Sequence, residues 1–359
     1  MSGYQIPHFG LARQYKNIGE ELLDATHRAM KDGQLVGGHF TRSFEEWLKH
    51  KTKTKYAITV HSGTQALEII ARYKHQDHYK RSLMLVDNPK IRIPNFTYPA
   101  TLNAFLTAGW DVELADTDKN GIIAHDVRSG GIYDCVMGYT GRKPWANANY
   151  SNAHGVIVDG AQHWLVADGD VGSGMAISFD PTKNLNASGN GGAIVTNDEK
   201  LYLYASSYRD NCKPYFHEVG TNSKMSEIDC AHLLVRVKYI DEWQKRREEI
   251  AKFWCDKFSG LPVTCLSNTT DSHAHQKFVM YLPDPQSLLN HLVLNGIDCK
   301  RHYEYVLGDL PSTLNLKKPD MLSTSVMLSR GVISLPMYPE LTDSEVEYIA
   351  TKVDQYFNQ

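Results

Sequence analysis

The sequence predicts an α/β protein: a large domain over residues 1–244, which opens with a helical segment and is built on a mostly parallel sheet, and a smaller α+β domain over residues 245–359. Three observations lead to this prediction. Short apolar segments alternate with helical patterns up to about residue 200, which is typical of βαβ units. Small, polar or charged residues follow several of these segments, at the edge of a parallel sheet where ligands gather. After about residue 245 the alternation stops.

The elements of the large domain follow from the hydrophobic pattern. Strands are predicted where apolar and β-branched residues stand together, over residues 56–60, 83–87, 92–94, 112–115, 135–138, 155–159, 175–178 and 192–196. Helices are predicted where apolar residues recur at three- and four-residue spacing, over 18–31, 44–51, 65–73 and 101–108, and as one long helix over 225–247.

The small domain is predicted to contain two strands, residues 277–282 and 332–335, and two helices. The first helix covers residues 286–294, because Asp284 and Pro285 form a start signal and Gly296 a stop signal. The second covers residues 343–357.

Composition narrows the class of partner. The 359 residues carry 38 basic and 41 acidic side chains, a net charge of −3, which offers no bulk attraction for nucleic acid or anionic lipid. We therefore expect neither nucleic acid nor a membrane as a partner. No segment resembles a secretory signal or approaches the ~18 apolar residues of a membrane helix. The six cysteines include no C-x-x-C pair, so we expect reduced thiols and a cytoplasmic location.

Two of the predicted strand ends carry candidate ligand-binding residues. Ser62-Gly63-Thr64 opens a helix, where exposed N–H groups and the helix dipole favour a phosphate, although a turn with a capping serine explains it too. Asp159 ends the apolar strand GVIVD, and a buried carboxylate needs a partner. A helix cap or a structural ion pair is the alternative for Asp159.

Two further features complete the set. Lys183 directly follows a strand and a proline-containing turn, and a glycine-rich return, Ser188–Ala193, comes after it. Tyr98 lies in a loop after a strand, where it either stacks on a planar ring or packs in the core. A phosphate cradle, a buried acid, a lysine and an aromatic ring are what an enzyme that uses pyridoxal 5'-phosphate requires.

These motifs resemble the DegT/DnrJ/EryC1/StrS family of nucleotide-sugar aminotransferases, over nearly the whole chain. The resemblance implies the aspartate-aminotransferase-like fold, which is fold type I of the pyridoxal phosphate enzymes. The segments that carry it are IPHFGLARQY (6–15), SGTQAL (62–67), PNFTYPATLNAFLTAG (94–109), VDGAQHW (158–164), SFDPTKNLNASGNGGAIVTND (178–198), HEVGTNSKMSEIDCAHL (217–233) and SLPMYPELT (334–342).

The resemblance also implies the roles of individual residues. Lys183 is the Schiff-base lysine and proton carrier, and Asp159 is the partner of the pyridine nitrogen. The implied cofactor contacts are Ser62, Gly63, Thr64, Tyr98, Asp159, Gln162, Ser178, Lys183 and, from the partner subunit of a homodimer, Asn222. The implied substrate contacts are Asn184, His217 and Lys224. Two positions depart from the family pattern: Val158 stands where glutamate is usual, and Lys224 where arginine is usual.

The implied reaction is transamination. Glutamate gives its amino group to the cofactor, and a nucleotide-linked keto sugar takes it up, as in the biosynthesis of amino sugars for polysaccharides. The ten positions from Lys183 to Ala193 resemble the loop of 3-keto-sugar enzymes, so a 3-keto-6-deoxyhexose is the expected substrate. A 4-keto-6-deoxyhexose, as in enzymes of the perosamine or viosamine type, is the alternative.

Three other possibilities are set against this reading. A dehydratase of the same fold carries histidine in place of the lysine, and this chain has Lys183. A non-catalytic regulator of the same fold is a more distant alternative. His273 and His275 have the spacing of metal ligands on a strand, but no third ligand is evident, so we expect two surface histidines and no metal.

Overall fold

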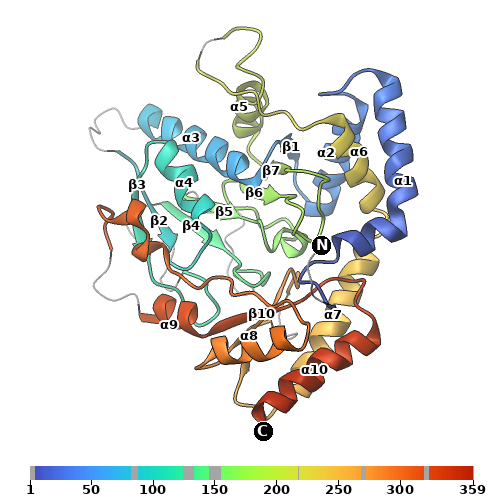
Figure 1. The fold of residues 1–359 in the computed structure, drawn as a ribbon. Coiled ribbons are helices and arrows are strands. Elements are labelled where there is room, and N and C mark those ends of the chain that lie inside the picture. Colours follow the sequence, from blue (N-terminus) through green and yellow to red (C-terminus); the bar gives the residue numbers. More distant parts are fainter. Residues whose placement is uncertain are drawn as a thin grey trace.

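The computed structural model describes residues 5–81, 88–123, 133–144, 155–216, 218–267, 272–318 and 323–358. In this part of the chain a seven-stranded sheet has the order β1-β7-β6-β5-β4-β2-β3 (Figure 1). Its strands are β1 (Tyr56–Val60), β2 (Lys90–Pro94), β3 (Asp111–Ala115), β4 (Tyr133–Met137), β5 (Val156–Asp159), β6 (Met175–Ser178) and β7 (Gly192–Thr196). The predicted α/β fold with a mostly parallel sheet is confirmed.

The direction of β7 matters for the site. Strands β2 to β6 pair in parallel, whereas β7 runs antiparallel to both β1 and β6. As a result β7 begins where its two neighbours end, with Gly192 opposite both Val60 and Ser178. The carboxyl ends of β1 and β6 therefore meet the start of β7 at one edge of the sheet.

Helices bury both faces of this sheet. Alternate strand residues divide between two apolar clusters, so that Ile157 packs on one side and Val156 and Val158 on the other. One face is covered by α3 (Gly63–Arg81), α4 (Pro99–Thr107) and α5 (Glu199–Tyr208), and the other by α1 (Leu11–Asp32), α2 (His39–Thr52) and α6 (Glu227–Arg236) (Figure 1). Burial on both faces explains why these strands read as continuous apolar segments.

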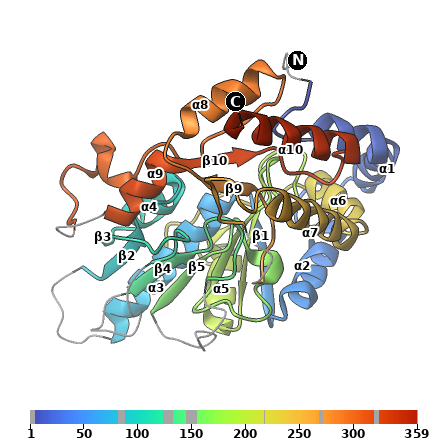
Figure 2. The same cartoon turned by 90° about the horizontal axis from the view of Figure 1, so that it is seen from below.

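A second, antiparallel sheet of three strands has the order β10-β9-β8. It contains β8 (Thr264–Cys265), β9 (Phe278–Tyr281) and β10 (Val332–Leu335). Four helices pack with it: α7 (Ile240–Lys257), α8 (Pro285–Leu294), α9 (Ser323–Gly331) and α10 (Asp343–Phe357). Figure 2 shows α8, β10 and α10 together on one side of the large sheet. Ile6 joins the apolar cluster of this unit, where its N–H donates to the carbonyl of Gly296 over 3.0 Å. Three short 3₁₀ turns, Trp164–Val166, Leu307–Asp309 and Pro311–Thr313, complete the described elements.

Several helices begin at side chains that cap them. Asp284 accepts the N–H of Ser287 at the start of α8, as the sequence predicts, and Thr342 forms a capping box with Glu345 at the start of α10. Among the helices of the described segments, none combines the length and apolar character needed to cross a membrane.

The single long helix predicted over residues 225–247 is wrong. The chain forms α6 and α7 instead, with a tight turn at residues 237–239 between them. There the hydrogen bonds switch from four-residue to three-residue spacing, because Lys238 and Tyr239 donate to the carbonyls of Val235 and Arg236. Both helices bury apolar faces, so the hydrophobic periodicity continues across the break and hides it.

Three other differences concern element placement. The sequence pattern missed α5 and α9. The predicted strand over 83–87 lies within residues 82–87, outside the described residues. The domain boundary between residues 244 and 245 falls inside α7 and stays a prediction.

Candidate active site

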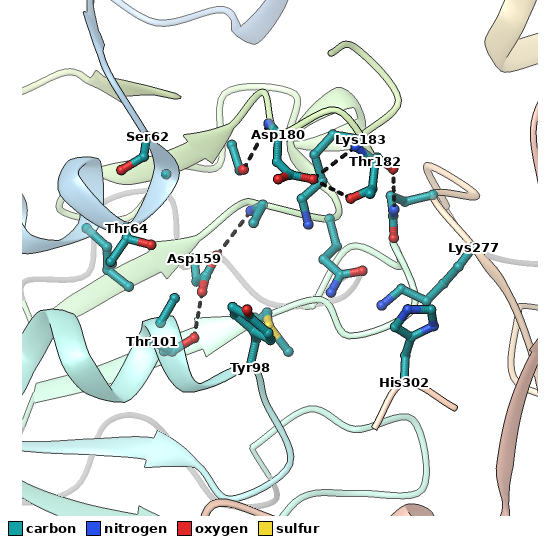
Figure 3. A pocket seen from close by; sticks show the side chains of 18 of the residues that line it. Ser62, Thr64, Tyr98, Thr101, Asp159, Asp180, Thr182, Lys183, Lys277 and His302 are labelled. Atoms are coloured by element: carbon teal, nitrogen blue, oxygen red, sulfur yellow. Dashed lines mark hydrogen bonds between the residues drawn. The ribbon is translucent and has the colours of Figure 1, made fainter. Parts of the chain in front are cut away.

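A pocket of about 510 Å³ opens at the edge where β1, β5 and β6 end (Figure 3). The large sheet and its loops supply most of its wall, while Lys277, His302 and Tyr303 come from the region of the small sheet. Of the sequence-predicted cofactor contacts, the structure brings eight to this pocket: Ser62, Gly63, Thr64, Tyr98, Asp159, Gln162, Ser178 and Lys183.

The start of α3 forms one side of the pocket. The N–H of Gln65 donates to Ser62 Oγ over 3.2 Å, and the N–H of Ala66 donates to the Ser62 carbonyl over 3.0 Å, so Ser62 is also a capping residue. A Cβ on Gly63 would stand 2.7 Å from Ser178 Cβ. Only glycine therefore fits where the start of α3 passes the end of β6. The N-terminal end of a 19-residue helix thus faces the pocket with its positive dipole.

Asp159 is buried at the end of β5 and is held by two donors. Thr101 Oγ1 donates to its Oδ2 over 2.8 Å, and the N–H of Ala161 donates to its Oδ1 over 3.1 Å. Burial raises the pKa of this carboxyl, while the two hydrogen bonds and the charge of Lys183 act in the opposite direction. A cationic ring nitrogen beside Asp159 would stabilise its ionised form.

Lys183 is positioned by a turn that the Asp180 side chain closes. Thr182 donates its N–H (2.9 Å) and its hydroxyl (2.5 Å) to Asp180 Oδ1, and the N–H of Lys183 donates to the Asp180 carbonyl over 2.9 Å. Burial lowers the pKa of the Lys183 ammonium, although the charges of Asp180 and Asp159 oppose that effect. A larger share of neutral amine makes this lysine a better nucleophile and proton carrier.

Tyr98 and Gln162 line the same pocket as Asp159 and Lys183. Tyr98 is 56% exposed and lines the pocket, so the possibility of a core residue is wrong and the ring is free to stack. Gln162 is buried, and its Nε2 donates to the Tyr303 hydroxyl over 3.1 Å. Its Oε1 has no hydrogen-bond partner among the described residues. A buried amide that can still form a hydrogen bond is suited to meet the ring oxygen of pyridoxal phosphate. The residues of the pocket therefore fit that cofactor.

Three of the remaining predicted contacts, Asn184, Asn222 and Lys224, do not line this pocket. Asn184 lines a smaller neighbouring cavity and donates to the Ala274 carbonyl over 2.5 Å. Lys224 pairs with Asp210, and Asn222 is exposed on the same projecting segment. His217 falls outside the described residues. Of the two expected substrate contacts that the structure describes, Asn184 and Lys224, neither lines the pocket of this single chain.

The expected surface position of the two strand histidines is wrong. His273 and His275 are buried, with ring centroids 4.2 Å apart, and His273 Nε2 lies 2.9 Å from Thr140 Oγ1. Burial lowers the pKa of His275 to about 4, so the ring stays neutral. In the described ranges no group of three or more His, Cys, Asp or Glu side chains is placed to hold a metal.

Sequence reasoning missed several residues of the pocket. Thr101, Asp180 and Thr182 lie inside the quoted motifs, where each hydroxyl or carboxylate next to a key residue could have been noticed. His8 lies inside the quoted IPHFGLARQY motif, but nothing about its type or spacing marks it as a pocket residue. Lys277, His302 and Tyr303 come from segments with no motif of their own, and no local pattern indicates them.

Comparison with known proteins agrees with this geometry. The model of the DegT/DnrJ/EryC1/StrS aminotransferase family matches residues 16–127 and 149–354. A pleiotropic regulatory protein of Geobacillus stearothermophilus is 24% identical and covers 98% of both chains. The dTDP-3-amino-3,4,6-trideoxy-α-D-glucose transaminase of Streptomyces venezuelae is 27% identical, over 94% of this chain and 92% of that one. The crystal structure of S. venezuelae DesV in complex with a ketimine intermediate superposes with a TM-score of 0.88 at 23% identity and covers 99% of both chains.

Proposed function

Because this chain belongs to the DegT/DnrJ/EryC1/StrS aminotransferase family, we propose that it transfers an amino group from glutamate to a keto sugar linked to a nucleotide. The observation that carries this proposal is the joint position of Lys183 and Asp159 in one pocket, beside the N-terminus of α3. An amine of lowered pKa, a buried acid and an anion-binding helix end are the three groups that such a transfer needs.

The proposed cofactor is pyridoxal 5'-phosphate, which when bound supplies an electron sink for the carbon that loses its proton. Ser62, Gly63, Thr64 and Ser178 would hold its phosphate at the start of α3. Asp159 would pair with its ring nitrogen, Gln162 would meet its ring oxygen, and Tyr98 would stack on the ring. Asn222 of the partner subunit would add a donor to the phosphate.

Lys183 and Asp159 are the two residues that we propose take part in the chemistry. The Lys183 amine, whose pKa is lowered by burial, takes a proton from the donor carbon and later returns one to the sugar carbon. Asp159 would keep the ring nitrogen of the bound cofactor cationic. Thr101 holds the Asp159 carboxylate in place by a hydrogen bond. Asn184, His217 and Lys224 are the proposed contacts to the sugar nucleotide.

We propose carbon 3 of a 6-deoxyhexose as the position of amination. Ten positions separate Lys183 from Ala193, and the length of this return beside the lysine sets how a hexose ring approaches it. A misplacement of about 1 Å at this point can slow a reaction about a hundredfold, so the approach of the ring favours one carbon over its neighbour. A 4-keto-6-deoxyhexose is the second candidate substrate, since both sugars are hexoses of the same size and charge.

The test is a panel of 3-keto and 4-keto sugar nucleotides with glutamate, followed by mass spectrometry and, for the product, by NMR. We expect a mass change that marks the exchange of oxygen for an amino group, and an amine on carbon 3. Lys183→Ala is the control. We expect it to retain no more than about a hundredth of the parent rate. A carbon-4 amine would overturn the regiochemistry alone, and no exchange with any sugar would support the regulator alternative.

Three further features belong to this proposal. The protein acts as a homodimer, which the exposed apolar side chains of Tyr215, Phe216 and Val219 support. It acts in the cytoplasm, consistent with free thiols at all six cysteines. Its domains divide between residues 244 and 245, so that all nine proposed cofactor contacts belong to the large domain.

A further inference from the structure

A second lysine, Lys277, lines the pocket and has no part in the function proposed above. It is 5% exposed and directly precedes β9. Its neighbour Gln276 donates from Nε2 to the carbonyl of Thr182 over 2.9 Å, one residue before Lys183. This hydrogen bond joins the start of β9 to the turn that carries Lys183. Lys277, which follows Gln276, therefore lies in the wall of the pocket.

The surroundings of the Lys277 ammonium offer it no opposite charge. Its Nζ lies 5.2 Å from the ring centroid of Tyr303 and 5.4 Å from that of Tyr139. Among the described residues no carboxylate pairs with it, and the charged group that acts on it is Lys183, another cation. Aromatic faces stabilise a buried ammonium only in part. An anion that enters the pocket would supply the missing charge.

The position of Lys277 separates it from the proposed phosphate cradle. In Figure 3 Lys277 and His302 lie on the opposite side of the pocket from Ser62 and Thr64. The two carboxylates of the pocket wall, Asp159 and Asp180, act on Lys183 and not on Lys277. The cofactor phosphate has donors of its own at the start of α3, so Lys277 remains available to a reactant.

We propose that Lys277 binds a carboxylate of a reactant, an inference that rests on the proposed function. The donor amino acid brings such a carboxylate to the pocket, and a sugar acid could bring one on its hexose ring. Either group accepts hydrogen bonds from the ammonium and restores its full charge, since an adjacent anion favours the protonated form. A buried charge-assisted contact of this kind strengthens binding about 10- to 100-fold.

The first arm of the test measures binding of glutarate, an unreactive dicarboxylate. The protein loaded with pyridoxal phosphate is titrated by calorimetry as the wild type, as Lys277→Met and as Lys317→Met. Lys317 is the matched control, because it is exposed and already pairs with Glu113. We expect the dissociation constant to rise about 10- to 100-fold in Lys277→Met and to stay unchanged in Lys317→Met.

The second arm separates the two sources of the carboxylate. UDP-glucuronic acid and UDP-glucose differ in one carboxylate, so their affinities for wild type and Lys277→Met are compared. Loss of glutarate affinity alone assigns Lys277 to the amino donor. Loss of UDP-glucuronic acid affinity, with glutarate and UDP-glucose unaffected, assigns it to a sugar acid.

Two outcomes would overturn the inference. One is unchanged affinity for every carboxylate in Lys277→Met. The other is a changed absorption spectrum of the loaded enzyme in that variant while the affinities for glutarate and for UDP-glucuronic acid both stay unchanged, which would assign Lys277 to the ring oxygen of the cofactor. Lys277→Arg keeps the charge and should retain carboxylate binding, which guards against a folding defect. Since these readouts are binding constants, they remain interpretable if the keto-sugar panel fails.

Discussion

At the scale of single residues, Lys183 and Asp159 depart from their ordinary pKa values in opposite directions for one shared cause. Burial disfavours charge, so it lowers the pKa of the lysine and raises that of the acid. Each charge favours the ionised form of the other, which limits both shifts. Ionisable groups whose pKa values are shifted by burial and by each other's charge are typical of functional sites.

Substitution of Asp159 tests the electrostatic part of this pair. Asp159→Asn keeps the shape and the contact with Thr101, but removes the charge that a ring nitrogen needs. We expect the rate of amino transfer to fall by about 10² to 10³, the usual effect of losing one preorganised electrostatic contact. Steady-state kinetics of the loaded enzyme measure it. A loss of less than about tenfold would mean that Asp159 acts as a cap and not as a partner of the cofactor.

The residues of the site differ in how far they could be predicted. Ser62, Asp159 and Lys183 each follow a strand that the apolar pattern reveals, so their meeting at one sheet edge could be predicted from the sequence. Lys277 and His302 reach the pocket from the small sheet, through contacts between segments far apart in the chain. Contacts of this kind cannot be predicted from a local sequence pattern.

At the scale of elements, close packing of backbones at the site leaves no room for side chains. A Cβ on Gly192, the first residue of β7, would stand 2.3 to 2.5 Å from backbone atoms of Ser62 and Gly63. Backbone cannot rotate away as a side chain can. The antiparallel entry of β7 between β1 and β6 therefore depends on this glycine.

A matched pair of substitutions tests that dependence. Gly192→Ala should lower the free energy of unfolding by about 1–3 kcal/mol, the usual cost of overpacking, and weaken retention of the cofactor. Gly189→Ala lies in the same glycine-rich return, but its Cβ would meet nothing within 4 Å, so stability should hardly change. Urea unfolding of both variants measures the difference. Equal midpoints would contradict the packing argument.

Helix boundaries show where sequence patterns stop being informative. The break between α6 and α7 contains neither glycine nor proline, and both helices keep apolar residues on their buried faces. The hydrophobic period alone therefore predicts one helix. The start of α8 could be predicted, because its signal, Asp284 and Pro285, lies directly at the helix start. The capping box of α10 is just as local, but it was not identified from the sequence.

At the scale of the whole molecule, the segment after α5 projects from the large sheet (Figure 1). It carries Asn222, and Tyr215 and Val219 on it are more than 80% exposed. Exposed apolar side chains of this size mark a contact with another protein. A second copy of the chain is the partner we expect.

The dimer prediction is tested on the intact protein. Light scattering at micromolar concentration should give twice the 40.6 kDa mass of the chain, from an interface of roughly 2,000 Å² or more. Asn222→Ala should leave that mass unchanged and speed the loss of cofactor during dialysis. A monomer that retains cofactor as tightly as the proposed dimer would contradict a shared site.

The central claim is that Lys183, and no other lysine, carries the cofactor. The pocket contains a second lysine, Lys277, which is buried and could in principle carry the cofactor instead. The purified, loaded protein is reduced with borohydride, digested, and mapped by mass spectrometry. We expect the absorption band of the bound cofactor to bleach and a pyridoxyl group to appear on the peptide that contains Lys183. A pyridoxyl group on Lys277, or on no lysine, would contradict the claim.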